Sequence, residues 1–259
     1  MIVKNSIKIV LLGGTLLLGG CASGYVVKEI EGGRVAMTAE YDKNPDRDAE
    51  AILQPYRRVV DSIMSPVVGH SARALEAYRP ESPLSNLLAD IIRRGAAGIS
   101  GKPADVGVMN MGGIRNSLPE GEVTYGMVYE ITPFENAVCV LTLDGKTLME
   151  LFRQIAGRGG EGLSGARLVI SPDGKLLSAE VGGRPVDEGK DYTVATIDYL
   201  AEGNDRMAAF REAKSKTFPP EPLLLRTVFL DYVKECERKG RFVDAPAGGR
   251  ITVAKSENK

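Results

Sequence analysis

Apolar residues recur at helical spacing in four stretches of the chain. The first stretch follows Asn44-Pro45, with Asn44 as the expected cap and Pro45 in the first turn. The second begins at Ser82-Pro83, and the third follows the turn Asp144-Gly145. The spacing predicts four amphipathic helices. Their stripes comprise Ala49, Ile52, Leu53, Tyr56, Val59, Val60 and Ile63; Leu84, Leu87, Leu88, Ile91 and Ile92; Leu148, Leu151, Phe152 and Ile155; and Leu225, Val228, Phe229, Tyr232, Val233 and Cys236.

Short apolar runs alternate with these helices and predict strands. The runs are residues 67–68, 106–109, 138–143, 167–170, 176–181, 192–197 and 250–253. Asp173-Gly174 predicts a hairpin, and the glycine-rich residues 157–165 predict a mobile loop. The order of elements predicts an α/β to α+β fold, in which helices cover a mixed β-sheet.

The N-terminus has the features of an export signal. Lys4 and Lys8 precede an apolar run that is too short to span a bilayer, and the run ends in Leu-Gly-Gly-Cys21. This resembles a bacterial lipobox, which predicts a signal peptide at residues 1–20 and a lipid on Cys21. Because no Asp follows Cys21, we expect an anchor in the outer membrane, facing the periplasm, rather than in the inner membrane. We expect an anchor-proximal segment at residues 21–45, with a short hairpin around Gly32-Gly33.

Charge and residue counts exclude several functions. The chain has 33 basic and 34 acidic residues. Removal of residues 1–20 would remove two lysines and no acidic residue, which leaves a net charge of −3 (31 − 34). This charge gives no argument for nucleic-acid binding. With His70 as the only histidine, a two-metal hydrolase site in this chain is not expected. Cys139 and Cys236 are expected to be small core residues, and whether they pair is left open.

The run Asn110-Met-Gly-Gly-Ile-Arg115 directly follows a predicted strand. Glycines let a ligand approach the backbone, Asn110 can both donate and accept a hydrogen bond, and Arg115 suits phosphate or carboxylate. Alone, the run favours an ordinary turn with a solvated arginine, because such turns are common.

Three further loop motifs occur beside predicted strands and helices. They are residues 81–86 (ESPLSN), 133–136 (PFEN) and 198–205 (DYLAEGND). Together with residues 110–115, they resemble the C-terminal domain of the 5′-nucleotidase family over residues 46–253. We therefore expect this domain at residues 46–255, with a short tail at 256–259.

The resemblance implies a nucleotide-binding site. Phe134 and Tyr199 would sandwich the base, Asn110 would contact its edge, Asp205 would accept from the ribose hydroxyls, and Arg115 would meet phosphate or ribose. Arg79 would supply a second phosphate contact. Each aromatic residue could instead belong to the core, and Asp205 could be a turn residue.

Other residues in these motifs are expected to be structural or to depart from the family pattern. Glu81 and Asn86 would cap a helix or brace a loop, and Asp90 would be solvated. The family usually reads Gly-Gly-Asp-Gly-aromatic where this chain has Gly203-Asn-Asp-Arg-Met207. Arg206 would either contact phosphate or narrow the pocket.

In the 5′-nucleotidase family, an N-terminal metallophosphatase domain supplies two metals and the catalytic residues. Nothing before residue 46 resembles such a domain, so we expect no catalytic residue, metal or cofactor in this chain. The leading hypothesis is the substrate-binding half of a two-chain nucleotide phosphohydrolase, in which a separate metallophosphatase chain carries the metals. The alternatives are an envelope protein that binds nucleosides or nucleotides without hydrolysis, a non-binding structural remnant, and, last, a self-sufficient hydrolase.

Overall fold

A computed structural model describes residues 27–255, which divide into two compact units at Ile52–Leu53. In the first unit, residues 27–38 form no strand and are exposed, and a short 3-10 helix, η1 (Tyr41–Lys43), follows. The hairpin expected around Gly32-Gly33 is therefore wrong for the described part of that segment, because two strands without a packed face have little to stabilise them. Cys21 and the expected signal peptide lie outside the described residues.

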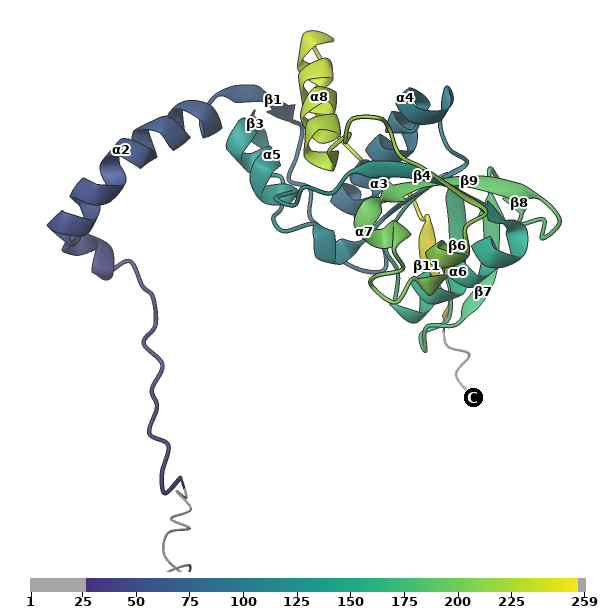
Figure 1. Ribbon diagram of the computed structural model, residues 1–259, viewed down its shortest axis with the longest axis horizontal. Helices are drawn as coiled ribbons and strands as arrows, with labels where there is room; N and C mark the ends of the chain where they lie inside the picture. Colours follow the sequence, from purple (N-terminus) through teal and green to yellow (C-terminus); the bar gives the residue numbers. More distant parts are fainter. Residues whose placement is uncertain (1–26, 256–259) are drawn as a thin grey trace, which may run out of the picture. The chain divides into compact units, whose positions relative to one another are not determined.

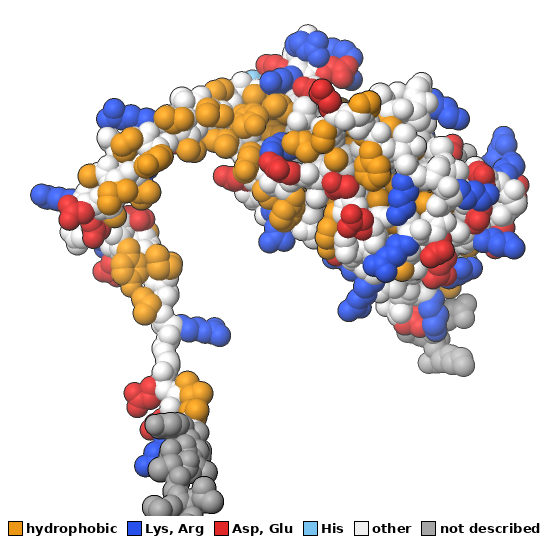
Figure 2. Space-filling model, in the orientation of Figure 1, with side chains coloured by type: hydrophobic (Ala, Val, Ile, Leu, Met, Phe, Trp, Pro, Cys, Tyr) orange, Lys and Arg blue, Asp and Glu red, His pale blue; other side chains and the backbone are white. Residues whose placement is uncertain are grey.

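Helix α2 (Arg47–Met64) crosses the division between the two units. Its cap is Asp46 rather than Asn44, since the Asp46 carboxylate accepts hydrogen bonds from the backbone N–H groups of Asp48 and Ala49. The predicted apolar stripe is present, but none of its side chains is buried. Figure 2 shows hydrophobic side chains exposed along this helix. No helix among residues 27–255 is long and apolar enough to cross a membrane.

The second unit is built on a mixed five-stranded sheet and two smaller sheets (Figure 1). The central sheet has the order β10 (Ser215–Thr217), β4 (Val138–Asp144), β9 (Asp191–Ile197), β2 (Val106–Met109), β5 (Gly162–Ser164). The second has the order β11 (Ile251–Val253), β6 (Ala166–Ile170), β7 (Leu176–Val181), β8 (Arg184–Pro185), and β1 (Val67–Ser71) pairs with β3 (Gly121–Thr124). Strands β2 and β9 are parallel, as are β6 and β11, and all other neighbours are antiparallel.

Helices cover these sheets, and the predicted apolar stripes at residues 84–92, 148–155 and 225–236 each lie in one of these helices. The helices are α3 (Pro83–Gly95), α4 (Ala97–Ser100), α5 (Tyr125–Ile131), α6 (Gly145–Gly157), α7 (Asp198–Ala201) and α8 (Leu225–Arg238), with 3-10 turns η2 (Met111–Gly113) and η3 (Ala208–Glu212). Helix α3 lies on β2 and β5, α6 contacts β4 and β7, and α8 contacts α3 and β1. Ser82 caps α3 and Asp144 caps α6, each through its side chain. The predicted mixed sheet covered by helices is confirmed.

The core is apolar and closely packed. At Gly107 in β2, a Cβ atom would lie 2.4 Å from the carbonyl oxygen of Ala89 in α3, so only glycine lets helix and strand approach this closely. Cys139 and Cys236 are both buried and free, as core cysteines. Burial raises the pKa of the Cys139 thiol to about 12, which leaves it unreactive as a nucleophile.

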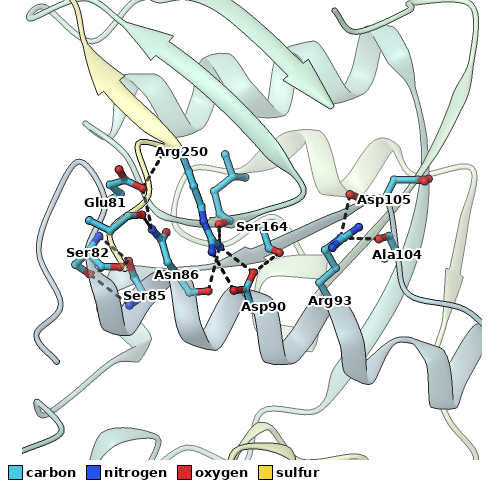
Figure 3. A network of polar contacts seen from close by, with 12 residues as sticks. Glu81, Ser82, Ser85, Asn86, Asp90, Arg93, Ala104, Asp105, Ser164 and Arg250 are labelled. Carbon is cyan, nitrogen blue, oxygen red and sulfur yellow. Dashed lines mark hydrogen bonds and ion pairs between the residues drawn. The ribbon is translucent and has the colours of Figure 1, made fainter. Parts of the chain in front are cut away.

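Two expectations from the sequence are wrong in this unit. The glycine-rich residues 157–165 are not a mobile loop, because Gly162–Ser164 form the buried strand β5 beside β2. Asp90 is not simply solvated: its two carboxylate oxygens accept from Arg250 at 2.8 and 2.9 Å, and one of them also accepts from Ser164 (Figure 3). Asp90 thus ties α3 to the segment that enters the last strand.

Glu81 and Asn86 brace this same region, as expected. Glu81 accepts hydrogen bonds from the side chain of Asn86 and the backbone N–H of Arg250, both drawn in Figure 3. The Asn86 side chain also donates to the carbonyl of Ala247. The cap of α3 itself is Ser82.

Candidate functional site

Strand pairing brings three of the sequence motifs to one edge of the central sheet. Strands β2 and β9 are parallel, so residues 110–115 and 198–205 leave the sheet at the same edge. Strand β4 runs antiparallel to β9, with Val138 opposite Ile197, so the loop 133–136 enters at that edge too. The buried Thr196 hydroxyl donates to the Val108 carbonyl and fixes β9 against β2 beside the site.

A cavity of about 300 Å³ lies where these loops meet. It is lined by Asn110, Gly112, Gly113, Phe134, Asn136, Tyr199 and Asp205. Four of the six predicted substrate-binding residues therefore share one cavity. Phe134 and Tyr199 keep 47% and 40% of their surface exposed, so neither ring is a core plug. Two accessible aromatic rings beside polar groups suit a flat ligand with hydrogen-bonding edges.

Asn110 and Asp205 form the polar side of the cavity. The Asn110 side-chain amide donates to Asp205 Oδ2 at 2.7 Å, and the Tyr199 hydroxyl donates to Asp205 Oδ1 at 3.3 Å. The negative charge of Asp205 raises the pKa of the Tyr199 hydroxyl above its usual value, so that hydroxyl stays protonated and remains a donor. A Cβ atom at Gly113 would lie 2.7 Å from Asn110 Oδ1, so glycine leaves room for the amide.

Asp205 is presented by a strained turn. Asp205 and Arg206 have φ angles of 54° and 60°, a left-handed conformation that side chains other than glycine rarely adopt. The Asn204 side chain holds the turn by donating to the Tyr199 carbonyl at 2.8 Å. Arg206 is exposed and is not among the residues lining the cavity, so it does not narrow it. Strain of this kind is often found at ligand sites.

The two predicted phosphate contacts lie apart from this cavity. Arg115 is exposed, donates to the Gly112 carbonyl at 3.3 Å, and lines a neighbouring depression with Glu76 and Asn116. Arg79 donates to Glu161 at 2.6 Å. Their roles in phosphate binding stay predictions.

Two charged residues beside the site were not expected from the sequence. Arg158, at the end of α6, lies 3.5 Å from Asp205 Oδ2 through its Nη2 atom and donates from Nε to Glu161 at 2.6 Å. Glu161 is fully buried. Both belong to the glycine-rich stretch that was expected to be a mobile loop, and no periodicity there indicates a buried carboxylate.

Comparison with known proteins identifies the domain. Residues 67–212 match the family model described as 5′-nucleotidase, C-terminal domain. The chain belongs to this family. The 5′-nucleotidase C-terminal domain is of nucleotide-binding type and is normally paired with a metallophosphatase domain.

Individual relatives of this 5′-nucleotidase C-terminal domain are larger proteins. The chain is 30% identical over 178 residues to silent protein UshA(0) of Salmonella typhimurium, covering 66% of this chain and 32% of that protein. It is 32% identical over 165 residues to endonuclease YhcR of Bacillus subtilis, covering 61% of this chain and 13% of that protein. It thus spans a third or less of these curated relatives.

A solved structure agrees with the fold. The 5′-nucleotidase precursor from Thermus thermophilus superposes with a TM-score of 0.71 at 28% identity, covering 81% of this chain and 43% of that one. The predicted resemblance to the 5′-nucleotidase C-terminal domain is therefore confirmed by sequence and by fold.

Proposed function

We propose that this domain binds the nucleoside part of a nucleotide and serves as the substrate-binding half of a two-chain nucleotide phosphohydrolase. The observation that carries the proposal is the cavity in which Phe134, Tyr199, Asn110 and Asp205 meet. Base stacking on an aromatic ring contributes about 1–3 kcal/mol per base and tolerates different bases. A flat ring between Phe134 and Tyr199 and a sugar beside Asp205 would use each of these groups.

Asp205 is suited to the ribose. Among residues 27–255, it is the only acidic residue that lines the cavity, and its Oδ2 atom is already engaged by Asn110. Its Oδ1 atom has one long contact, from the Tyr199 hydroxyl at 3.3 Å. The 2′- and 3′-hydroxyls of a ribose are donors that this oxygen can accept, with the strength of a hydrogen bond to a charged group.

In this proposal the phosphate points away from the stacked base, toward Arg79 or Arg115. Either guanidinium could pair with phosphate oxygens, as the resemblance to the family implies. The chemistry of phosphate cleavage would come from a metallophosphatase, which we place on a separate chain. Among residues 27–255, no group of three or more His, Cys, Asp and Glu side chains could hold a metal ion.

We further propose that the protein is anchored at the cell envelope through a lipid on Cys21, on the periplasmic face of the outer membrane. The support is the sequence pattern before Cys21. Labelling of cells with radioactive palmitate, compared between the natural chain and Cys21→Ala, tests the anchor. Equal labelling of both would contradict it.

Measurement of phosphate release tests whether this chain binds the nucleotide without hydrolysing it. The protein is incubated with AMP and Mn²⁺ or Mg²⁺, and released phosphate is measured beside AMP binding. The proposal expects binding of AMP with no release by this protein alone. Multiple-turnover release that survives repurification and is lost in Asp205→Ala would contradict the two-chain arrangement while leaving the nucleotide site intact.

A further inference from the structure

Glu161 joins three segments of the chain, and two of its partners, Met111 and Arg158, adjoin or contact residues that line the cavity. Its carboxylate is fully buried, yet it faces three donors, two of them from distant parts of the chain and one three residues before it. Oε1 accepts from Arg79 and from Arg158, each at 2.6 Å, and Oε2 accepts from the backbone N–H of Met111. A buried carboxylate with this many partners holds them in place, because the carboxylate charge would be costly to leave unpaired in the interior.

The segment that carries Glu161 is fixed against its surroundings. Gly160 has a φ angle of 106°, and a Cβ atom there would lie 2.0 Å from the carbonyl oxygen of Pro80. Gly162 is equally close-packed, since a Cβ atom there would lie 2.5 Å from the carbonyl oxygen of Ser85. The backbone on both sides of Glu161 therefore packs directly against the segment before α3 and the first turn of α3. Glu161 has little freedom to move.

Arg158 connects Glu161 to the ribose side of the cavity. Its Nε atom donates to Glu161, and its Nη2 atom lies 3.5 Å from Asp205 Oδ2. The planar guanidinium can face both carboxylates at once, and the bond to Glu161 sets its orientation. Asn110 and Arg158 then share Asp205 Oδ2, while Oδ1 accepts from the Tyr199 hydroxyl at 3.3 Å. Met111, whose N–H is held by Glu161, directly follows Asn110.

We propose that Glu161 is a positioning residue for ribose recognition. It orients Arg158 and the backbone after Asn110, and the side chains of Arg158 and Asn110 hold Asp205 through Oδ2, which leaves Oδ1 with the capacity to accept from a sugar hydroxyl. This inference rests on the proposed function, because it assumes that a nucleoside occupies the cavity. It goes further in naming the ribose hydroxyls as the feature that Glu161 helps the site to distinguish.

A purely structural role for Glu161 predicts a different result. If Glu161 only stabilised the fold, its loss would weaken the binding of every nucleoside to a similar degree. If it positions Asp205, its loss affects ligands that carry ribose hydroxyls and spares those that lack them. The ratio of two affinities therefore separates the two roles.

The test compares adenosine with 2′,3′-dideoxyadenosine by calorimetric titration of the whole protein and of Glu161→Gln. We expect the natural protein to prefer adenosine by at least about tenfold, the range of a hydrogen bond to a charged group. In Glu161→Gln, adenosine should bind about tenfold more weakly, while dideoxyadenosine changes less than about threefold. Glu150→Gln is the matched control: Glu150 also lies in the region of α6 and accepts from Arg153 and Gln154, but it is exposed.

A second variant keeps the test decisive if Glu161→Gln folds poorly. Arg158→Gln removes the link while leaving the buried carboxylate with Arg79 and Met111, and the same loss of preference is expected. An unchanged preference in a folded variant, or equal weakening of both ligands, would overturn the positioning role. If the natural protein binds neither ligand, the proposed function itself fails, and this inference fails with it.

Discussion

Replacing Phe134 by alanine is a direct test of base stacking in the cavity. The ring is 47% exposed, so its removal should cost the fold little: full burial of a phenylalanine contributes about 1.5–3 kcal/mol, and half burial about 1 kcal/mol. Stacking of a base on an aromatic ring contributes about 1–3 kcal/mol, which corresponds to an affinity loss of roughly 5- to 150-fold. The larger effect should therefore fall on binding rather than on stability.

The assay is calorimetric titration with adenosine, accompanied by urea unfolding of each variant. Phe218→Ala is the matched control, because Phe218 is 49% exposed and does not line the cavity. Phe134→Tyr, which keeps an aromatic face, should retain binding within a few-fold. Equal adenosine affinity in Phe134→Ala and the natural protein would refute the stacking role.

Three further predictions concern the frame of the site. Gly107→Ala should lower the free energy of unfolding by about 1–3 kcal/mol or more, because the new Cβ atom would lie 2.4 Å from the backbone of α3. Urea unfolding measures this loss. Gly157→Ala is the control and should show almost no effect, because nothing lies within 4 Å of its new Cβ atom. Arg206→Asn should raise the free energy of unfolding by about 0.5–1 kcal/mol, since asparagine tolerates the left-handed φ of 60° better; a drop in stability would contradict the strain argument. The backbone N–H of Thr147 lowers the pKa of Asp144 below its usual 3.8, so the stability this carboxylate adds to α6 is present above that pH and is lost as the pH falls through the lowered value. The stability difference between the natural protein and Asp144→Asn should therefore shrink as unfolding is measured at pH values descending from about 5 to about 2.5, and a constant difference would contradict this.

The sequence predicts those parts of the fold that depend on local periodicity. The stripes of α3 and α6, and the runs of β2, β4 and β9, are visible because each element buries one continuous set of side chains. The residues that line the cavity could be predicted because they lie in loop motifs next to predicted strands. Asn110, Phe134, Tyr199 and Asp205 meet because β2, β4 and β9 are neighbours, which the motif order implies only through the family resemblance.

Partners that are distant in the chain could not be predicted. Asp90 and Arg250 are 160 residues apart, and no local pattern shows that one will neutralise the other. Glu161 sits between two glycines, where residue type indicates a flexible loop, yet its burial depends on Arg79 and Arg158. Around Gly32-Gly33 the sequence predicts a hairpin, but residues 27–38 form no strand. Two strands there would have no third element to pack against.

The most direct test of the central claim is titration of the protein from Ala22 onward with AMP and with adenosine, beside Asp205→Ala. In the part of the chain that the structure describes, Asp205 is the only acidic residue lining the cavity, and its Oδ1 atom accepts a long hydrogen bond of 3.3 Å from the Tyr199 hydroxyl. The account predicts saturable binding of both ligands by the natural protein and, in Asp205→Ala, a loss of affinity of about tenfold or more. Absence of binding by the natural protein, or binding that Asp205→Ala leaves unchanged, would contradict a nucleoside site in this cavity.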